Sequence, residues 1–396
     1  MASIEISNVE HDGKSFAAYR KVVLLMSNPD VLYLNSAFMP PSNLLAQWLA
    51  VAEETRALVG RYINAEPSTL SFTRGTTEAL GYFIRSIKFS PGDNVVILDT
   101  EHPNHVLGWL SLRPPGLEVR KVPTTAEVDR TGQLTAANAA TFAPYVDERT
   151  KAIGLSSIMS HSGQWNDVKD ICDTYRPQGI HILADLTQQV GFTHVDVQAL
   201  DILHKGLKCP TGFGVLYVNQ QVLEGLSPEH HMTTFASLAE RRADFTVDVA
   251  DRILLQNNAR RFNHWNQNLS AVAAAKALLT FYLDIMVKPK RVESYLFSLG
   301  NALRDEYKQL RIRIIGPQSR KEHAPYLYIL DINGEGWVNL MKENGVQISP
   351  YRLGIRVSFG FYNNLDDVKI LAKILRQGLQ SELRTQAASG TASPKL

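Results

Sequence analysis

Short apolar runs alternate with helix-like segments between residues 70 and 220, and this alternation restricts the fold of the 396-residue chain more than any other feature. Asn94 to Asp99 and Ile180 to Ala184 are almost continuously apolar, which is typical of strands buried on both faces of a parallel sheet. Thr150 to Ile158 is another predicted strand. Asn166 to Tyr175, which lies between this strand and the one at Ile180 to Ala184, has the spacing of a helix. Strands that alternate with helices predict an α/β fold with a doubly wound, mainly parallel sheet.

Composition excludes several classes of protein. With 41 basic and 39 acidic residues the net charge is +2, which gives no support for a nucleic-acid partner. Two cysteines cannot build a disulfide framework, so we expect a cytoplasmic protein. No apolar run approaches the ~20 residues of a membrane span, and no metal-ligand or phosphate-loop motif occurs. The final Ser393-Pro-Lys-Leu396 resembles the Ser-Lys-Leu peroxisomal address, although a frayed tail explains it as well.

Polar residues follow the predicted strands where ligands bind in open α/β folds. Glu101-His-Pro-Asn-His105 follows one strand, and Asp185 ends another. A buried acid at such a position is costly without a cationic partner, unless it caps a turn. Thr76 and Thr77 begin a helix after Gly75, where free N–H groups favour an anion; an ordinary threonine cap is the alternative. The alternative for His102 and His105 is a pair of solvated imidazoles.

A lysine stands just before a glycine-rich turn and a buried strand. His204-Lys205 leads into Pro210-Thr-Gly-Phe-Gly214, and Val215 to Val218 has strand composition. A lysine amine at such a place can form a Schiff base if its surroundings lower its pKa. Judged on this stretch alone, a solvated lysine is the simpler interpretation.

Five motifs stand in a definite order along the chain: Gly75-Thr-Thr-Glu-Ala, Glu101-His, Asp185-x-x-Gln188, His204-Lys205 and Arg356-Val-Ser. Together they resemble the class V aminotransferase family of pyridoxal-phosphate (PLP) enzymes, which includes cysteine desulfurases and isopenicillin-N-epimerase-like proteins. The resemblance implies PLP-dependent fold type I, the aspartate-aminotransferase-like fold, and a homodimer. It implies an N-terminal segment of the small domain (1–30), a large PLP-binding domain (31–268), a small α+β C-terminal domain (269–384) and a disordered tail (385–396).

The same resemblance assigns the cofactor site. Lys205 would hold PLP through a Schiff base and act as base at the substrate Cα, with Lys208 as a less well placed competitor. Asp185 would pair with the pyridine nitrogen and favour its charged form. The other cofactor contacts implied are stacking by His102, a ring-hydroxyl bond from Gln188, and phosphate binding by Thr76, Thr77 and nearby His204.

Substrate binding is implied for Asn35, His161 and Arg356, with the planar arginine fork on the substrate carboxylate. The chain also departs from the family pattern. Ile202 replaces a common serine, and the segment between Asp185 and Lys205 is short. Asn266 stands where relatives carry a threonine for the partner subunit's phosphate, so we expect its amide to serve there.

The substrate is expected to be an amino acid, bound to PLP as an external aldimine. Residues 347–356 lack the cysteine that persulfide-forming desulfurases need, which argues against that mechanism. A resemblance to fungal secondary-metabolite members, those of loline alkaloid formation in particular, implies a Mannich-type cyclisation with an aldehyde co-substrate. The product would be a cyclic α-amino acid, formed in a pocket that excludes water. Aromatic side chains such as Phe38, Trp109, Trp265 and Phe361 could line it, and plain core packing is the alternative for each of them.

Other activities stay open at this point. A C–S or C–N lyase, or an epimerase, acting on an amino acid is the first alternative, and a lyase or cyclase is favoured over an aminotransferase. A cofactor-free dimeric binding protein that keeps the fold is the alternative from another functional class.

Overall fold

The computed structural model divides into two compact units, residues 1–54 and 55–396. The residues that it describes are 44–124, 134–197, 209, 211–228, 235–239, 254–264, 267–285, 289–351 and 353–381. The predictions for segment 1–30, for tail 385–396 and for the C-terminal tripeptide fall outside these ranges. The first unit therefore contributes only the start of helix α2 (Leu44–Ile63).

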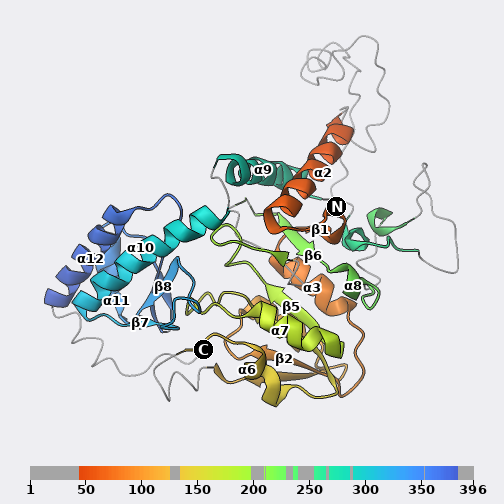
Figure 1. Ribbon diagram of the computed structural model, residues 1–396, viewed down its shortest axis with the longest axis horizontal. Helices are drawn as coiled ribbons and strands as arrows, with labels where there is room; N and C mark the ends of the chain where they lie inside the picture. The colour runs from red at the N-terminus through yellow and green to blue at the C-terminus, as the bar shows by residue number, and fades with distance from the viewer. Residues whose placement is uncertain are drawn as a thin grey trace, which may run out of the picture. The chain divides into compact units, whose positions relative to one another are not determined.

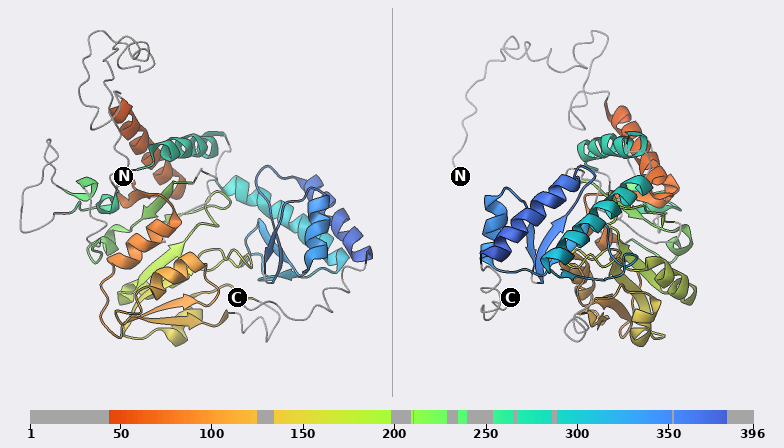
Figure 2. Two further views of the ribbon diagram at one scale, coloured as in Figure 1. Left: turned by 180° about the vertical axis from the view of Figure 1, so that it is seen from behind. Right: turned by 60° about the vertical axis from the view of Figure 1, so that its left-hand side comes forward.

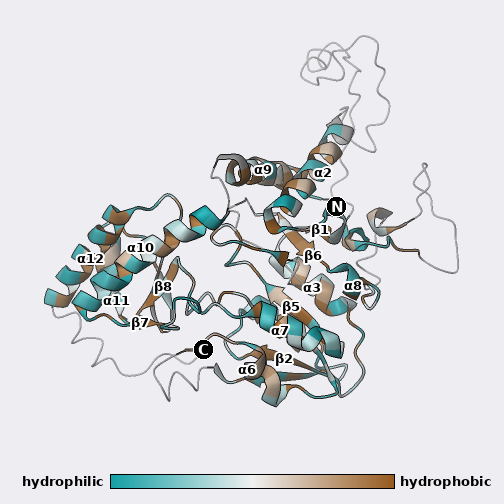
Figure 3. Cartoon of the chain, viewed as in Figure 1, coloured by the Kyte–Doolittle hydropathy of each residue, from teal (hydrophilic) through white to brown (hydrophobic). Residues whose placement is uncertain are grey.

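The larger unit contains a four-stranded parallel sheet (Figure 1). Its order is β3 (Glu118–Val122), β2 (Asn94–Leu98), β4 (Thr150–Ser156) and β5 (His181–Asp185), and all neighbours are parallel. β2 is buried along its whole length because helices cover both faces of such a sheet. Figure 3 shows β2 and β5 mostly in the hydrophobic colour. The α/β fold with a mainly parallel sheet is thus confirmed.

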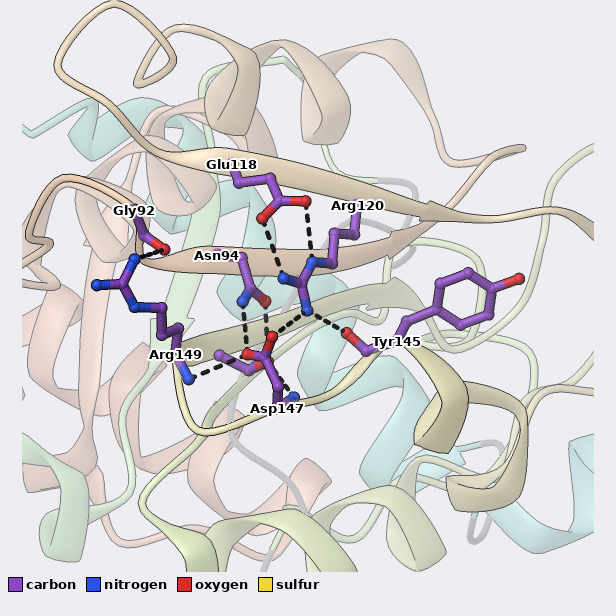
Figure 4. Close-up of polar contacts among 8 residues, drawn as sticks. Gly92, Asn94, Glu118, Arg120, Tyr145, Asp147 and Arg149 are labelled. Carbon is purple, nitrogen blue, oxygen red and sulfur yellow. Dashed lines mark hydrogen bonds and ion pairs between the residues drawn. The ribbon is translucent and has the colours of Figure 1, made fainter.

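The amino edge of this sheet is held by a polar network (Figure 4). Arg120 donates from Nε and Nη2 to the two carboxylate oxygens of Glu118, both at 3.0 Å, and Nη1 lies 2.7 Å from Asp147 Oδ2. Asp147 Oδ1 accepts 2.8 Å and 3.0 Å bonds from Asn94 Nδ2 and the Arg149 N–H. These bonds join the first residues of neighbouring strands to the loop before β4.

A separate antiparallel pair, β1 (Leu70–Thr73) and β6 (Gly214–Tyr217), precedes and follows the predicted lysine segment. Thr73 pairs with Gly214, and a Cβ on Gly214 would lie 2.6 Å from Thr73 Oγ1 and 2.7 Å from Gly75 Cα. Glycine is therefore required for β6 to lie against the turn that opens helix α3 (Thr76–Ser86). This confirms the predicted buried strand after Lys205 and the tight approach that precedes it.

A second, antiparallel sheet has the order β7 (Ile314–Ile315), β8 (Leu327–Leu330), β10 (Gly354–Ser358) and β9 (Ser349–Tyr351). Helices α10 (Pro289–Leu310), α11 (Glu335–Glu343) and α12 (Leu365–Gln380) share one apolar core with it. Figure 2 shows α10 and α12 side by side against this sheet.

The remaining elements connect these layers. They are α4 (Pro103–Leu110), α6 (Ala139–Phe142), α7 (Val168–Tyr175), α8 (Gln220–Leu223), α9 (Leu269–Thr280), a π-helical turn (Phe281–Ile285) and 3₁₀ turns at Pro67–Thr69, Ala143–Tyr145, Arg176–Gln178, Phe235–Ser237 and Ala259–Phe262. Within the described ranges, no helix combines the length and the apolar character needed to cross a membrane.

Candidate active site

A cavity of about 510 Å³ lies at the carboxyl edge of the parallel sheet. Its walls come from the start of α3, the loops after β2 and β4, the end of β5 with the loop that follows, and residues 209 and 211–213. Because parallel strands all end at one edge, side chains from distant stretches meet there. Six predicted site residues line it: Thr76, Thr77, His102, His161, Asp185 and Gln188.

Asp185 is the acid of this cavity. It ends β5, is 6% exposed, and its Oδ1 accepts a 2.8 Å bond from the Thr187 N–H. No cation pairs with this carboxylate among the described residues. An acid in such a place is unfavourable unless a positively charged group comes to it, so the carboxylate is an acceptor directed at a ligand.

The first turn of α3 supplies hydroxyl groups and helix N–H groups to the same cavity. Thr76 Oγ1 lies 3.2 Å from Thr187 Oγ1, and Thr77 Oγ1 accepts a 2.8 Å bond from Asn104 Nδ2. The first N–H groups of a helix have no acceptor within the helix, and the helix dipole adds positive potential. This end of the cavity is therefore suited to an anion.

His102 stands at the rim of the cavity. It is exposed and caps α4, where its Nδ1 accepts a 3.2 Å bond from the Asn104 N–H. His105 is not a solvated imidazole. Its side chain is completely buried, and its Nδ1 lies 3.5 Å from Glu101 Oε2. Glu101 in turn accepts bonds of 2.8 Å and 2.7 Å from the Ser156 N–H and Oγ. This buried pair therefore holds Ser156, a residue of the cavity wall.

His161 also lines the cavity, and its Nε2 is buried with no hydrogen-bond partner in the described part of the chain. Burial lowers the pKa of the imidazole, and the nearby charges of Glu101 and Asp99 only partly oppose this. The ring is therefore neutral near pH 7 and can accept a proton or a hydrogen bond from a ligand.

Arg356 does not line the cavity, but it is bonded to its wall. Its Nη1 donates to the carbonyl of Ser160 at 3.2 Å and to the Tyr351 hydroxyl at 2.6 Å, and Nη2 donates to Ser349 Oγ at 3.3 Å. The guanidinium carbon also lies 4.7 Å from the centre of the Tyr351 ring. These contacts hold the charged fork beside Ser160, which lines the cavity next to His161.

Sequence patterns missed several residues of the wall. Ser156, Thr187, Asn104, Phe192, Phe213 and Cys209 line the cavity but were not singled out for it. Thr187 could have been found, because it follows Asp185 by two residues in the same loop. No sequence pattern around Phe192 indicated that it lines the cavity.

The expected aromatic lining is wrong for two residues. Trp109 is fully buried and packs near Phe89 and His105, since it lies on the inward face of α4. Phe361 packs with Phe281 and Tyr282, and neither Trp109 nor Phe361 contacts the cavity.

Other predicted site residues lie outside the described ranges. They are Asn35, His204, Lys205 and Asn266, together with Phe38, Trp265 and Lys208. Cys209, four residues along the chain from Lys205, does line the cavity. In the ranges that are described, no group of three or more histidine, cysteine and acidic side chains could hold a metal ion.

The chain is similar to known proteins. The family model for aminotransferase class V matches residues 41–371. An uncharacterized aminotransferase of Schizosaccharomyces pombe is 41% identical over 393 residues, 92% of this chain and 96% of the relative. A probable cysteine desulfurase of Vibrio cholerae is 26% identical over 373 residues, 85% of each chain.

Solved structures agree on the fold. A cystine C–S lyase in complex with cysteine persulfide superimposes with a TM-score of 0.73 over 91% of this chain and 92% of its own, at 17% identity. A cysteine desulfurase of Thermococcus onnurineus reaches 0.71 over 86% of each chain at 19% identity. The five motifs, the cavity at the sheet edge and these matches lead to one assignment. The chain belongs to the class V aminotransferase family and is a pyridoxal-phosphate-dependent enzyme of fold type I.

Proposed function

We propose that the cavity at the carboxyl edge holds PLP and that the enzyme acts at the Cα of an amino acid. The observation that carries the proposal is Asp185, a buried carboxylate that faces the cavity without a cation among the described residues. A protonated pyridine nitrogen is the partner that this acid lacks. When bound, PLP supplies an electron sink for the bond that breaks at Cα.

The rest of the cavity fits the same cofactor. Thr76 and Thr77, at the start of α3, would bind the phosphate through hydroxyl and helix N–H groups. His102 would lie over the ring, and the Gln188 amide would bond the ring oxygen. Lys205 would hold the cofactor through its amine and then take the proton from Cα. His204 and Asn266 would add phosphate contacts.

The substrate would enter beside His161 and Arg356. Arg356 is oriented by three acceptors and presents a planar cation, which suits the two oxygens of an α-carboxylate. His161 would meet the substrate side chain as a neutral imidazole, and Asn35 would add a contact to the substrate. An amino acid is the class of substrate that this combination favours.

Elimination at Cβ is the reaction that we favour, in a C–S or C–N lyase. Cys172 is buried in α7, and burial raises the pKa of Cys209 to about 11, so neither thiol is a ready nucleophile. The relatives named cysteine desulfurase support carbon–sulfur chemistry. The sulfur or nitrogen group would leave Cβ with its bonding electrons after Lys205 takes the Cα proton, without any persulfide on the protein.

Mannich-type cyclisation in alkaloid formation is the second candidate. Ile158 and Met159 are buried, and with Phe192 they give the cavity an apolar wall. Such a wall keeps water from protonating Cα after its proton has been removed. In a Mannich-type reaction Cα would instead form a bond to the carbon of an iminium made from an aldehyde co-substrate. Epimerisation would need only return of the proton to the other face of Cα.

One experiment separates these reactions. The PLP-loaded enzyme is incubated in D₂O with a panel of amino acids, with and without aldehydes, and products are followed by NMR and mass spectrometry. Release of sulfide or ammonium with a keto acid supports the lyase; a product that contains the aldehyde carbon supports the cyclase; deuterium at a racemised Cα supports the epimerase. Lys205→Ala is the inactive control. A loaded enzyme that exchanges no Cα proton of any amino acid would contradict the proposal.

The assembly and location are also proposals. We infer a homodimer, because the family resemblance assigns Asn266 to the partner's phosphate site, and sedimentation of the purified protein tests it. The small number of cysteines, two in the whole chain, supports a cytoplasmic location. A cofactor-free binding protein is set aside, since the chain is a PLP-dependent enzyme.

A further inference from the structure

A tyrosine from the antiparallel sheet reaches the loop that carries Gln188. Tyr326 lies one residue before β8 and is 1% exposed. Its hydroxyl donates to the Gln188 backbone carbonyl and lies 3.3 Å from the Gln188 side-chain oxygen Oε1. One hydroxyl proton is thus shared between two oxygens of a single residue, a three-centre arrangement.

The end of the Gln188 amide that takes part in this contact is its oxygen. The oxygen Oε1 is directed at Tyr326, so the nitrogen Nε2 on the other side of the amide carbon is directed away from it. Gln188 lines the cavity, and Nε2 has no partner in the described part of the chain. The amide therefore offers the cavity two N–H donors rather than an acceptor.

Tyr326 is itself held rigidly. Its ring stacks on Phe192 with centroids 4.0 Å apart and planes within 5°. Its carbonyl accepts a 2.8 Å bond from the N–H of Phe359, the residue that directly follows β10. Burial raises the pKa of the Tyr326 hydroxyl, against the opposing effect of the Arg356 charge, so the hydroxyl keeps its proton and remains a donor.

We propose that Tyr326 is a positioning residue that fixes the Gln188 amide with its N–H groups toward the ring oxygen of PLP. This rests on the proposed function, which gives Gln188 that contact. A donor aimed at the ring oxygen favours its deprotonated form. Tyr326 therefore lowers the pH at which the visible spectrum of the bound cofactor titrates, although it does not touch the cofactor.

The test is a pH titration of the visible absorbance of the PLP-loaded protein, wild type against Tyr326→Phe. The variant keeps the ring that stacks on Phe192 and loses only the hydroxyl. We expect its titration midpoint to rise by about half to one pH unit, the equivalent of one hydrogen bond.

Tyr328→Phe is the matched control. Tyr328 is also buried, lies in β8, and donates a 2.9 Å bond to a backbone carbonyl, that of Pro325, but it does not contact Gln188. Its loss should lower thermal stability about as much as Tyr326→Phe and leave the midpoint unchanged.

Gln188→Ala completes a double-mutant cycle. This variant alone should raise the midpoint, and adding Tyr326→Phe to it should change nothing further. A midpoint that stays constant or falls in Tyr326→Phe overturns the inference, because the amide would then be free of Tyr326 or would present its oxygen. A protein that takes up no PLP would overturn both this inference and the proposed function, whereas an unchanged midpoint in a coloured protein overturns this inference alone.

Discussion

Both edges of the parallel sheet are polar, but among the described residues the carboxyl edge contains buried polar groups that lack a partner. At the amino edge, Asp147 contacts Arg120, Asn94 and the Arg149 N–H (Figure 4). At the carboxyl edge, Asp185 accepts one backbone N–H bond and has no cation in the described residues, and His161 Nε2 has no partner there.

This difference between the two edges indicates that the amino edge contributes to stability and the carboxyl edge to function. Polar groups that are paired inside the protein hold strands together, whereas buried groups that face a cavity without partners are maintained for a ligand. Substitutions at the amino edge should therefore change stability and spare activity, and substitutions at the carboxyl edge should do the reverse.

Asp185→Asn gives the largest expected effect. The amide keeps an oxygen for the Thr187 N–H but removes the charge that would pair with the cofactor. We expect kcat/KM to fall by about 10²–10³-fold, the range seen for a lost preorganised electrostatic contact. The melting temperature of the cofactor-free protein should stay constant or rise, since Asp185 forms no ion pair with any described residue. A lower melting temperature with activity retained would show that Asp185 stabilises the fold, as Asp147 does, and does not serve the cofactor.

Arg356→Lys should follow. A lysine keeps the charge but cannot match both oxygens of a carboxylate, so we expect KM for the amino acid to rise about tenfold, with a smaller change in kcat. Steady-state kinetics with the substrate found by the panel measures this. Unchanged KM would show that the carboxylate binds elsewhere.

Arg120→Met tests the amino edge. It removes the bidentate contact with Glu118 and the pair with Asp147, so the melting temperature should fall by a few degrees. Because this edge is at the other end of the strands from the cavity, kcat/KM should not change. Loss of activity at temperatures where the variant is folded would break the distinction between the two edges.

The smallest effect concerns pH. Hydrogen bonds from Arg120 and then Asn94 lower the pKa of Asp147 from its usual 3.8 to about 2. A depressed carboxyl pKa adds stability above the unfolded value, and this is lost as the pH falls from about 4 through about 2. Denaturant unfolding of wild type and Asp147→Asn should therefore converge in that window. A stability difference that stays constant down to pH 2 would contradict the pairing.

Local sequence patterns predicted the site residues whose position depends only on residues nearby in the chain. Thr76 and Thr77 at a helix start, and Asp185 at the end of an apolar run, are visible because strand ends and helix starts are short-range features. Contacts across the fold were not predictable. Tyr326 meets Gln188 over 138 residues of sequence, and Asn94 meets Asp147 over 53. The wrong expectation for Trp109 has the same origin, since composition does not reveal which face of a short helix turns inward.

The central claim is that the cavity at the carboxyl edge holds PLP on Lys205. Its most direct test is reduction of the PLP-loaded protein with borohydride, followed by peptide mass mapping. We expect a phosphopyridoxyl group on Lys205 in the wild type, and none on the same peptide in Lys205→Ala. Labelling of Lys208 or of a lysine elsewhere, with Lys205 unmodified, would contradict it.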